Sequence, residues 1–274
     1  MKGFVLTACQ RKGGVGRSTL LYNLAGALSK RGLKVLLVDL DPQASISQII
    51  LSPEAVDVLP VNRSIVAMLG DDYFGSARSI IQPAGIPGVD LVPGSNALSR
   101  FNFPEPEKTG DLQDSLREAL TDVRGEYDAI LCDTPPSLET LAWIPAVAAD
   151  VALTPTPAEA LAVQELVHAG RFLERVRWAR NPRLVWLGVV LTMLQPRLAI
   201  HEAYTRSLRE SYGDLVLENP VPYNVAFKEC VVARQPLAFW KPKGTPAKAI
   251  DAVAGEILAR VDKLRAADQG RGAA

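Results

Sequence analysis

The chain has 274 residues and no net charge at pH 7, with 30 basic and 30 acidic side chains. This length allows one large α/β domain, so we expect a single domain over residues 1–274 with a flexible tail from about 266 to 274. Although 48% of the residues are apolar, no run is long and uncharged enough to span a bilayer, and the N-terminus lacks signal-peptide features. The three cysteines have no metal-binding spacing, which favours a reducing compartment and a cytoplasmic location.

Charge is divided unevenly between the two halves of the chain. Residues 1–150 carry 13 Lys+Arg and 18 Asp+Glu, whereas residues 151–274 carry 17 and 12. This difference has two interpretations: ordinary fluctuation, or a basic face contributed by the C-terminal half.

Apolar segments typical of strands alternate along the chain with helical patterns. In chain order, the pattern predicts a strand over 4–9, a helix over 18–32, strands over 34–41 and 89–94, a helix over 112–125, strands over 127–136 and 150–156, a helix over 158–178, a strand over 184–194, a helix over 199–213, a strand over 215–222 and a helix over 246–264. Residues 52–106 are rich in Gly, Pro and polar side chains and are expected to be mostly surface excursions. The alternation predicts an α/β fold, with a mostly parallel twisted sheet and helices on both faces.

The segment RKGGVGRS at residues 11–18 lies between the first predicted strand and the first predicted helix. This is the position of a phosphate-binding loop in phosphate-loop NTPases, in which glycines turn backbone N–H groups toward phosphate and the helix N-terminus adds its dipole. The predicted nucleotide-binding residues are Gly13, Gly14, Val15, Gly16, Arg17, Ser18 and Thr19. Ser18 is placed to ligate Mg²⁺, and Thr19 to touch the α-phosphate.

The loop departs from the common form G-x-x-x-x-G-K-[ST] at two positions. Arg11 stands in place of the first glycine and Arg17 in place of the lysine, and an additional lysine, Lys12, lies early in the loop.

Carboxylates follow two other apolar strands. Asp39 and Asp41 end the segment VLLVDLD, and Asp133 ends AILCD. A strand-end aspartate either caps a helix or supports Mg²⁺ and its waters in phosphate-loop enzymes. Because ligands bind at the carboxyl ends of parallel strands, three such carboxylates beside one phosphate loop favour the magnesium role.

The segments KGGVGRST, DLDPQAS and CDTPPSL together resemble the ParA family of partition ATPases, in the group of deviant Walker A ATPases that includes MinD. VDLVPGSNALS and NPVPYNVAFKE also resemble family segments, and the second adds Pro222 and Asn224 to the expected nucleotide site. The resemblance implies that Lys12 is the signature lysine, which reaches across a homodimer interface so that two ATP molecules lie between the subunits. It also implies that Asp41 orients the attacking water, that Asp133 holds the Mg²⁺ shell and that Asp39 supports it, in a slow ATP hydrolase.

Arg17 departs from the family, which has lysine at that position. Arginine keeps the positive charge, but it is planar, longer and bidentate. Two interpretations follow: a tolerated variant that binds and hydrolyses ATP, or a site that binds ATP but cannot tighten around the transition state. In the second case the chain is a hydrolysis-impaired ATP-binding regulator.

The resemblance further implies that the ATP dimer binds DNA non-specifically on the nucleoid and that a ParB-like partner protein triggers its release. Such a machine positions a plasmid, a chromosome or another cargo. The candidate DNA-binding residues are Arg197, Arg206, Lys228 and Arg234. Dimerisation doubles these charges and raises affinity for phosphates, although basic runs are also typical of solvated helix faces.

Three related classes of protein fit the sequence less well. The first predicted strand begins at residue 4, so we expect the short form without an N-terminal DNA-binding domain. A MinD-like membrane-surface ATPase needs a bulky amphipathic helix at its C-terminus, but residues 256–274 contain no aromatic side chain, so we expect no membrane contact. An iron–sulfur reductase needs paired cysteines near the site, whereas Cys9 and Cys132 fit buried strands and Cys230 is isolated.

Overall fold

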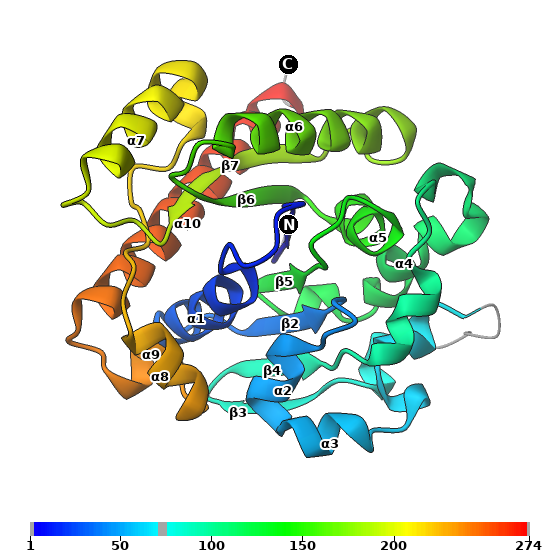
Figure 1. Cartoon of the computed structure of the whole chain (residues 1–274). Helices are drawn as coiled ribbons and strands as arrows, with labels where there is room; N and C mark the ends of the chain where they lie inside the picture. The colour runs from blue at the N-terminus through cyan, green and yellow to red at the C-terminus, as the bar shows by residue number, and fades with distance from the viewer. Residues whose placement is uncertain (1–2, 71–75, 273–274) are drawn as a thin grey trace.

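Seven strands form one sheet in the order β3-β4-β2-β5-β1-β6-β7 (Figure 1). The computed structural model describes residues 3–70 and 76–272. The strands are β1 Phe4–Ala8, β2 Val35–Asp39, β3 Gln82–Ile86, β4 Val89–Val92, β5 Ala129–Asp133, β6 Val151–Pro157 and β7 Val185–Thr192. All neighbouring strands are parallel except β3 and β4, which are antiparallel. The predicted α/β fold with a mostly parallel sheet is therefore confirmed.

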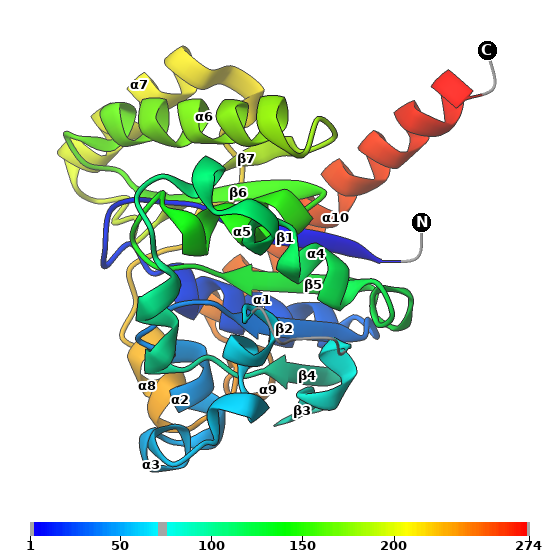
Figure 2. The ribbon, with the colours of Figure 1, turned by 90° about the vertical axis from the view of Figure 1, so that its right-hand side faces the viewer.

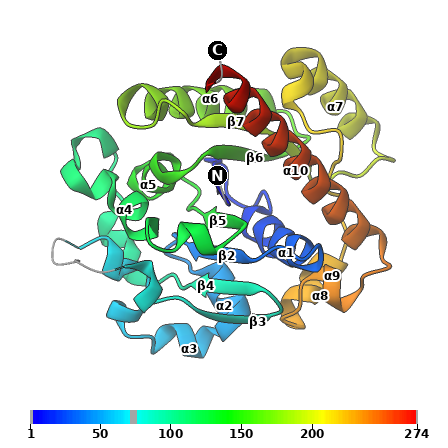
Figure 3. The same ribbon diagram turned by 180° about the vertical axis from the view of Figure 1, so that it is seen from behind.

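Helices cover both faces of this sheet. They are α1 Arg17–Lys30, α2 Ser45–Leu51, α3 Pro53–Asp57, α4 Ser115–Leu120, α5 Thr140–Ala148, α6 Ala162–Ala179, α7 Ala199–Tyr212, α8 Ala226–Val232, α9 Leu237–Trp240 and α10 Thr245–Gly272. Figure 3 shows α1 and α10 on one side of the sheet and α4 and α5 on the other, with α7 beyond the β7 edge. The end of α10 projects away from the body of the molecule (Figure 2). No helix in the described ranges is long and apolar enough to cross a membrane.

Strand β1, which lies between β5 and β6, contributes side chains to two separate cores, because successive side chains of a strand point to opposite faces. Phe4, Leu6 and Ala8 pack in the core beneath α1 and α10. Val5 and Cys9 pack in the core beneath α4 and α5. Burial on both faces explains why these strands read as continuous apolar runs in the sequence.

Several predicted boundaries are wrong. The expected strand at 215–222 forms only isolated bridges at Val216 and Pro222, since its two prolines remove ladder donors. The expected helix at 112–125 is reduced to α4 and flanking 3₁₀ turns. Strand β3 was not predicted, because Pro83 interrupts its alternating pattern. A proline is tolerated at this position because β3 is an edge strand.

The predicted surface excursion at 52–106 also differs from the structure. Besides the predicted strand at 89–94, which is β4, it contains the unpredicted β3, and Ile65, Val66 and Met68 are buried in the core beneath α4 and α5. Residues 71–75 of that range lie outside the described residues. At the C-terminus, α10 continues to Gly272 through most of the range expected to be a frayed tail, and residues 273 and 274 lie outside the described residues.

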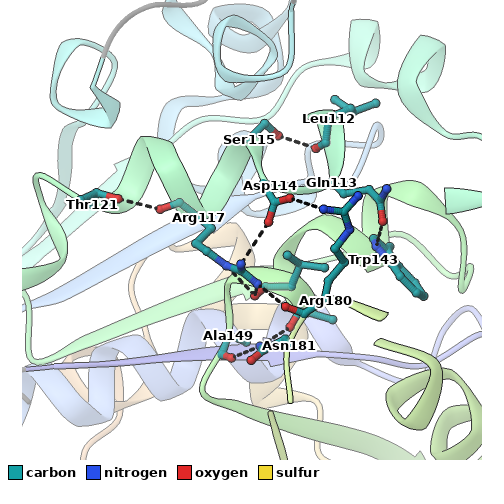
Figure 4. Close-up of polar contacts among 12 residues, drawn as sticks. Leu112, Gln113, Asp114, Ser115, Arg117, Thr121, Trp143, Ala149, Arg180 and Asn181 are labelled. Carbon is teal, nitrogen blue, oxygen red and sulfur yellow. Dashed lines mark hydrogen bonds and ion pairs between the residues drawn. The ribbon is translucent and has the colours of Figure 1, made fainter. Parts of the chain in front are cut away.

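Side chains from neighbouring elements satisfy the carbonyl groups at the end of α5 (Figure 4). Arg117 donates to the carbonyl of Val147 at 2.7 and 3.2 Å, and Asn181 donates to those of Ala146 and Ala149 at 3.0 and 2.7 Å. The last carbonyls of a helix have no partner within the helix, so these bonds hold α5 against α4 and the end of α6. They anchor the helix that follows β5.

Helix α1 packs against the start of α9 so closely that it needs glycine at residue 26. A Cβ atom added to Gly26 would lie 2.3 Å from Cβ of Pro236. One helical turn earlier, Oδ1 of Asn23 accepts a hydrogen bond of 2.9 Å from the backbone of Leu237. This contact fixes α1, and therefore the loop that precedes it.

We expect Gly26→Ala to lower the free energy of unfolding by about 1–3 kcal/mol, because overpacking outweighs the gain of about 0.5–1 kcal/mol that alanine normally brings to a helix. Urea unfolding measures the change. Gly255→Ala in α10 is the matched control, since its Cβ would meet only the guanidinium end of the long Arg31 side chain, at 3.2 Å, and no backbone or ring atom. Equal stability of the two variants would contradict the close packing.

Candidate nucleotide-binding site

The glycine-rich loop joins the end of β1 to the start of α1 and borders a cavity of about 630 Å³. Gly14 and Gly16 have φ angles of 74° and 80°, in the left-handed region that favours glycine. Thr192, at the end of β7, anchors the loop by donating a hydrogen bond of 2.9 Å to the carbonyl of Val15. Gly16 provides no side-chain cap for α1, so the first N–H groups of the helix are available to an anion.

The loop residues of the sequence prediction lie together on this cavity. Its lining includes Lys12, Gly13, Gly14, Val15, Gly16, Arg17, Ser18, Thr19 and Asp41. Residues 13–19 therefore border one cavity at the N-terminus of α1, where an anion could bind.

Asp39 and Asp133 are paired in register at the ends of β2 and β5, and both side chains are fully buried. Asp39 accepts hydrogen bonds from the backbone N–H and the hydroxyl of Ser47, at 2.9 and 2.7 Å. The Ser47 hydroxyl in turn accepts from the N–H of Gly94 at 2.8 Å. Asp39 thus ties β2 to α2 and, through Ser47, to the end of β4. The sequence analysis missed this role: Gly94 lies in the segment 89–99 that resembles the family, but Ser47 lies just after the segment 39–45.

Arg17 is the first residue of α1, and its guanidinium group turns toward the strand ends. Its Nε donates to Oδ1 of Asp133 at 3.2 Å, its Nη1 donates to the carbonyl of Gln10 at 2.9 Å, and its Nη2 lies 3.7 Å from Oδ2 of Asp41. Only 7% of the Arg17 side chain is exposed. The sequence analysis placed this residue among the nucleotide-binding residues, whereas here its donors face two carboxylates and a backbone carbonyl.

The two other basic residues of the loop pair with carboxylates near the start of α6. Lys12 forms an ion pair with Glu159, and Arg11 forms one with Glu165 at 2.9 Å. The Lys12 side chain remains 39% exposed at the edge of the cavity. Glu159 and Glu165 were missed, because nothing in the sequence around them indicates that they approach the loop.

Burial dominates the electrostatics of the strand-end carboxylates. It raises the pKa of Asp39 to about 7, with the charge of Asp133 adding to the shift. Burial also raises the pKa of Asp133, while the charge of Arg17 and the neighbouring Ser18 hydroxyl lower it. Burial likewise raises the pKa of Asp41.

The donors near the loop fit Mg²⁺ only together with a nucleotide. Oδ2 of Asp133 is buried and has no hydrogen-bond partner among the described residues. No group of three or more His, Cys, Asp or Glu residues in the described ranges could hold a metal ion by itself. Mg²⁺ is commonly held by one or two carboxylates, phosphate oxygens and waters. Ser18 and Asp133 match that donor set, with Asp39 one strand away.

A second cavity of about 330 Å³ adjoins the loop at Gly16 and Thr19. Its walls include Met193, Val221 and Phe227, together with the predicted Pro222 and Asn224. A mostly apolar cavity with a few polar groups suits a planar base, so the two predicted residues lie where such a group would bind.

The four candidate DNA-binding residues are exposed but lie on different elements. Lys228 and Arg234 lie at or just after α8, beside the second and the first cavity respectively. Arg197 precedes α7, and Arg206 lies on α7 and pairs with Glu202 at 3.2 Å. All three cysteines are free and buried in the described structure, in agreement with a core role for Cys9 and Cys132.

The raised pKa of Asp39 makes stability depend on pH. Between its ordinary value of 3.8 and about 7, the folded chain keeps the proton that the unfolded chain has lost. Stability should therefore fall as pH rises through this window, with a slope of at most about 1.4 kcal/mol per pH unit from this group. Asp39→Asn should make the fall shallower in urea unfolding without nucleotide or metal. Asp251→Asn, an exposed change on α10, should leave the slope unchanged, and an unchanged slope in Asp39→Asn would contradict the burial argument.

Comparison with known proteins agrees with this geometry. A family model described as an AAA domain matches residues 4–186. The chain is 33% identical over 261 residues to the chromosome partitioning protein ParA of Caulobacter vibrioides, covering 93% of this chain and 94% of that protein. It is 31% identical to the chromosome-partitioning ATPase Soj of Thermus thermophilus, covering 94% and 96%.

Solved structures share the fold. A cobyrinic acid a,c-diamide synthase from Mycobacterium smegmatis, solved with a bound ATP analog and magnesium, superposes with a TM-score of 0.78 at 27% identity, covering 93% of this chain and 94% of that one. A plasmid partition protein from Borrelia burgdorferi superposes with a TM-score of 0.75 at 23% identity, covering 95% and 100%. With the loop, the strand-end carboxylates and relatives that match over nearly their whole length, the chain belongs to the ParA family of partition ATPases.

Proposed function

We propose that this chain binds Mg²⁺ and ATP at the glycine-rich loop, forms an ATP-sandwich homodimer and binds DNA non-specifically on the nucleoid. With a ParB-like partner it positions or segregates a plasmid, a chromosome or another cargo. The observation that carries the proposal is the loop itself. Its glycines and the free end of α1 border a cavity that has Lys12 at its edge and Asp41 on its wall.

Each part of the site has a distinct task in this proposal. The N–H groups of residues 13–19 hold and orient the phosphates. Ser18 and Asp133 hold Mg²⁺, which when bound neutralises charge on the phosphate oxygens. Asp41 orients the attacking water. The second cavity receives the base against Pro222 and beside Asn224.

Lys12 is the residue through which dimerisation depends on ATP. In the single chain it pairs with Glu159, and both side chains are substantially exposed, 39% and 49%. An exposed ion pair contributes roughly 0–1 kcal/mol, so Lys12 can exchange Glu159 for the phosphates of a partner's ATP at small cost. The exchange links the two subunits only while ATP is present.

We expect Lys12→Ala to bind ATP with nearly unchanged affinity and to lose ATP-dependent dimers, as measured by light scattering with and without ATP. Glu159→Gln is the matched change on the other side of the pair. It frees Lys12 without removing it, so dimers should form at the same or a lower ATP concentration. Dimerisation that survives Lys12→Ala would show that Lys12 does not cross the interface.

DNA binding through Arg197, Arg206, Lys228 and Arg234 predicts a characteristic salt dependence. Log affinity should fall linearly with log salt, with a slope of about −0.9 per phosphate contact on duplex DNA. Replacing Arg206 and Lys228 with Glu should weaken binding to all sequences alike in the presence of ATP. Arg78→Glu, which also reverses an exposed charge but lies near the β3 edge, should have little effect. A strong preference for one sequence, or tighter binding to anionic liposomes than to DNA, would contradict the proposal.

The contacts of Arg17 support a second candidate function, an ATP-binding regulator that hydrolyses ATP poorly. Because its donors engage Asp133 and Asp41, Arg17 is less free to follow the charge that develops on the phosphates. Both candidates bind ATP and form dimers. Steady-state phosphate release by the wild type and by Arg17→Lys separates them: faster release by the lysine variant supports the regulator, and equal or slower release supports an active ATPase.

A further inference from the structure

Arg17 is the one cation within ion-pairing distance of the strand-end carboxylates in the described part of the chain. It lies 3.2 Å from Asp133 and 3.7 Å from Asp41, and the three side chains are at most 7% exposed. A buried carboxylate without a partner is strongly unfavourable, since neither water nor an opposite charge compensates for its lost hydration. Arg17 supplies that compensation in the chain without nucleotide.

The geometry of this contact uses the shape of arginine. Two nitrogen atoms of one planar group donate hydrogen bonds to Asp133 and to the carbonyl of Gln10, and the third lies 3.7 Å from Asp41. A lysine ammonium is a single point of charge on a flexible stem, and it cannot meet three such separated oxygens in this way. Lysine at this position would hold the carboxylates less firmly.

The same carboxylate is needed by the metal. If the proposed function is correct, Asp133 belongs to the Mg²⁺ shell, and its Oδ1 is already engaged by Arg17. Oδ2 of Asp133 has no partner among the described residues, so the metal can approach there, but its two charges and the guanidinium on Oδ1 would then share one carboxylate and repel each other at short range. Binding of Mg²⁺ with the nucleotide therefore weakens the hold of Arg17 on Asp133.

We propose that Arg17 is an internal counter-cation that competes with Mg²⁺ for Asp133, so that nucleotide binding is coupled to the release of Arg17 from the strand-end carboxylates. This inference rests on the proposed function for its metal. It assigns Arg17 two positions, on Asp133 and Asp41 in the free chain and away from Asp133 when metal and nucleotide are bound. It makes Arg17 a residue that sets the Mg²⁺ requirement of the site.

The first experiment measures how much Mg²⁺ is needed to bind a fluorescent ATP analogue, from metal-free buffer with EDTA up to saturating Mg²⁺. Arg17→Lys should reach half of its full affinity at an Mg²⁺ concentration lower than that of the wild type by about fivefold or more, the usual lower range for coupled sites. Arg11→Lys is the matched control, because Arg11 is the other arginine of the loop but pairs with Glu165 at the surface. An Mg²⁺ midpoint that is equal or higher in Arg17→Lys would overturn the competition.

The second experiment is a double-mutant cycle on thermal unfolding without nucleotide or metal, using Arg17→Met, Asp133→Asn and the double variant. Arg17→Met should lower the Tm, and adding Asp133→Asn should recover part of the loss, because it removes the uncompensated buried charge. If Arg17→Met does not fold, the same comparison is made with Arg17→Lys. A change at Asp133 that shifts the Tm equally with and without Arg17 would refute the counter-cation role.

These results separate the inference from the function on which it rests. If neither the wild type nor Arg17→Lys binds the analogue at any Mg²⁺ concentration, the proposed function fails and the competition fails with it. The cycle still decides whether Arg17 compensates Asp133 in the free chain. If both proteins bind with the same Mg²⁺ midpoint, the proposed function stands and the competition is wrong.

Discussion

Buried carboxylates at the carboxyl ends of two adjacent parallel strands are the constraint on which the site depends. The register of β2 and β5 places Asp39 beside Asp133, and neither side chain reaches solvent. Two like charges this close raise the free energy of the folded chain unless donors or cations compensate them. The surrounding structure supplies both, through Ser47 on one side and Arg17 on the other.

Because of this compensation, the three aspartates at the strand ends have different roles. Asp39 has its oxygens engaged by Ser47 and by the backbone of Asp41, so it holds α2 and the loop after β2 in place. Asp133 keeps one oxygen without a partner among the described residues, and Asp41 lies on the cavity wall. Asp41 therefore faces the cavity and Asp133 keeps an oxygen that is free within the described structure, whereas the oxygens of Asp39 are fully engaged.

The glycine-rich loop shows a similar division among its basic residues. Arg17 turns inward to the acids, whereas Arg11 and Lys12 turn outward to Glu165 and Glu159. The ion pair that Arg17 forms is buried and strong enough to shape the site. The ion pairs of Arg11 and Lys12 are exposed and easily exchanged. One short loop therefore carries one buried ion-pairing residue beside two exposed ones that exchange partners at small cost.

The sequence by itself determined the fold class, the family, the loop and the set of acids at the strand ends. These are local signals: continuous apolar strands, glycines before a helix, and aspartates directly after a strand, each readable within about ten residues. Strand β3 was missed because Pro83 and its edge position weaken such a pattern. Residues 215–222 were wrongly predicted to be a strand, because their apolar pattern is typical of one although their prolines leave only isolated bridges. Only the tertiary structure decided what Arg17, Asp39 and Lys12 contact. The sheet register brings Asp133 to Arg17, and the packing of α2 brings Ser47 to Asp39. The packing of the segment before α6 brings Glu159 to Lys12. Side-chain partners far apart in the chain follow from that packing, which no local pattern encodes.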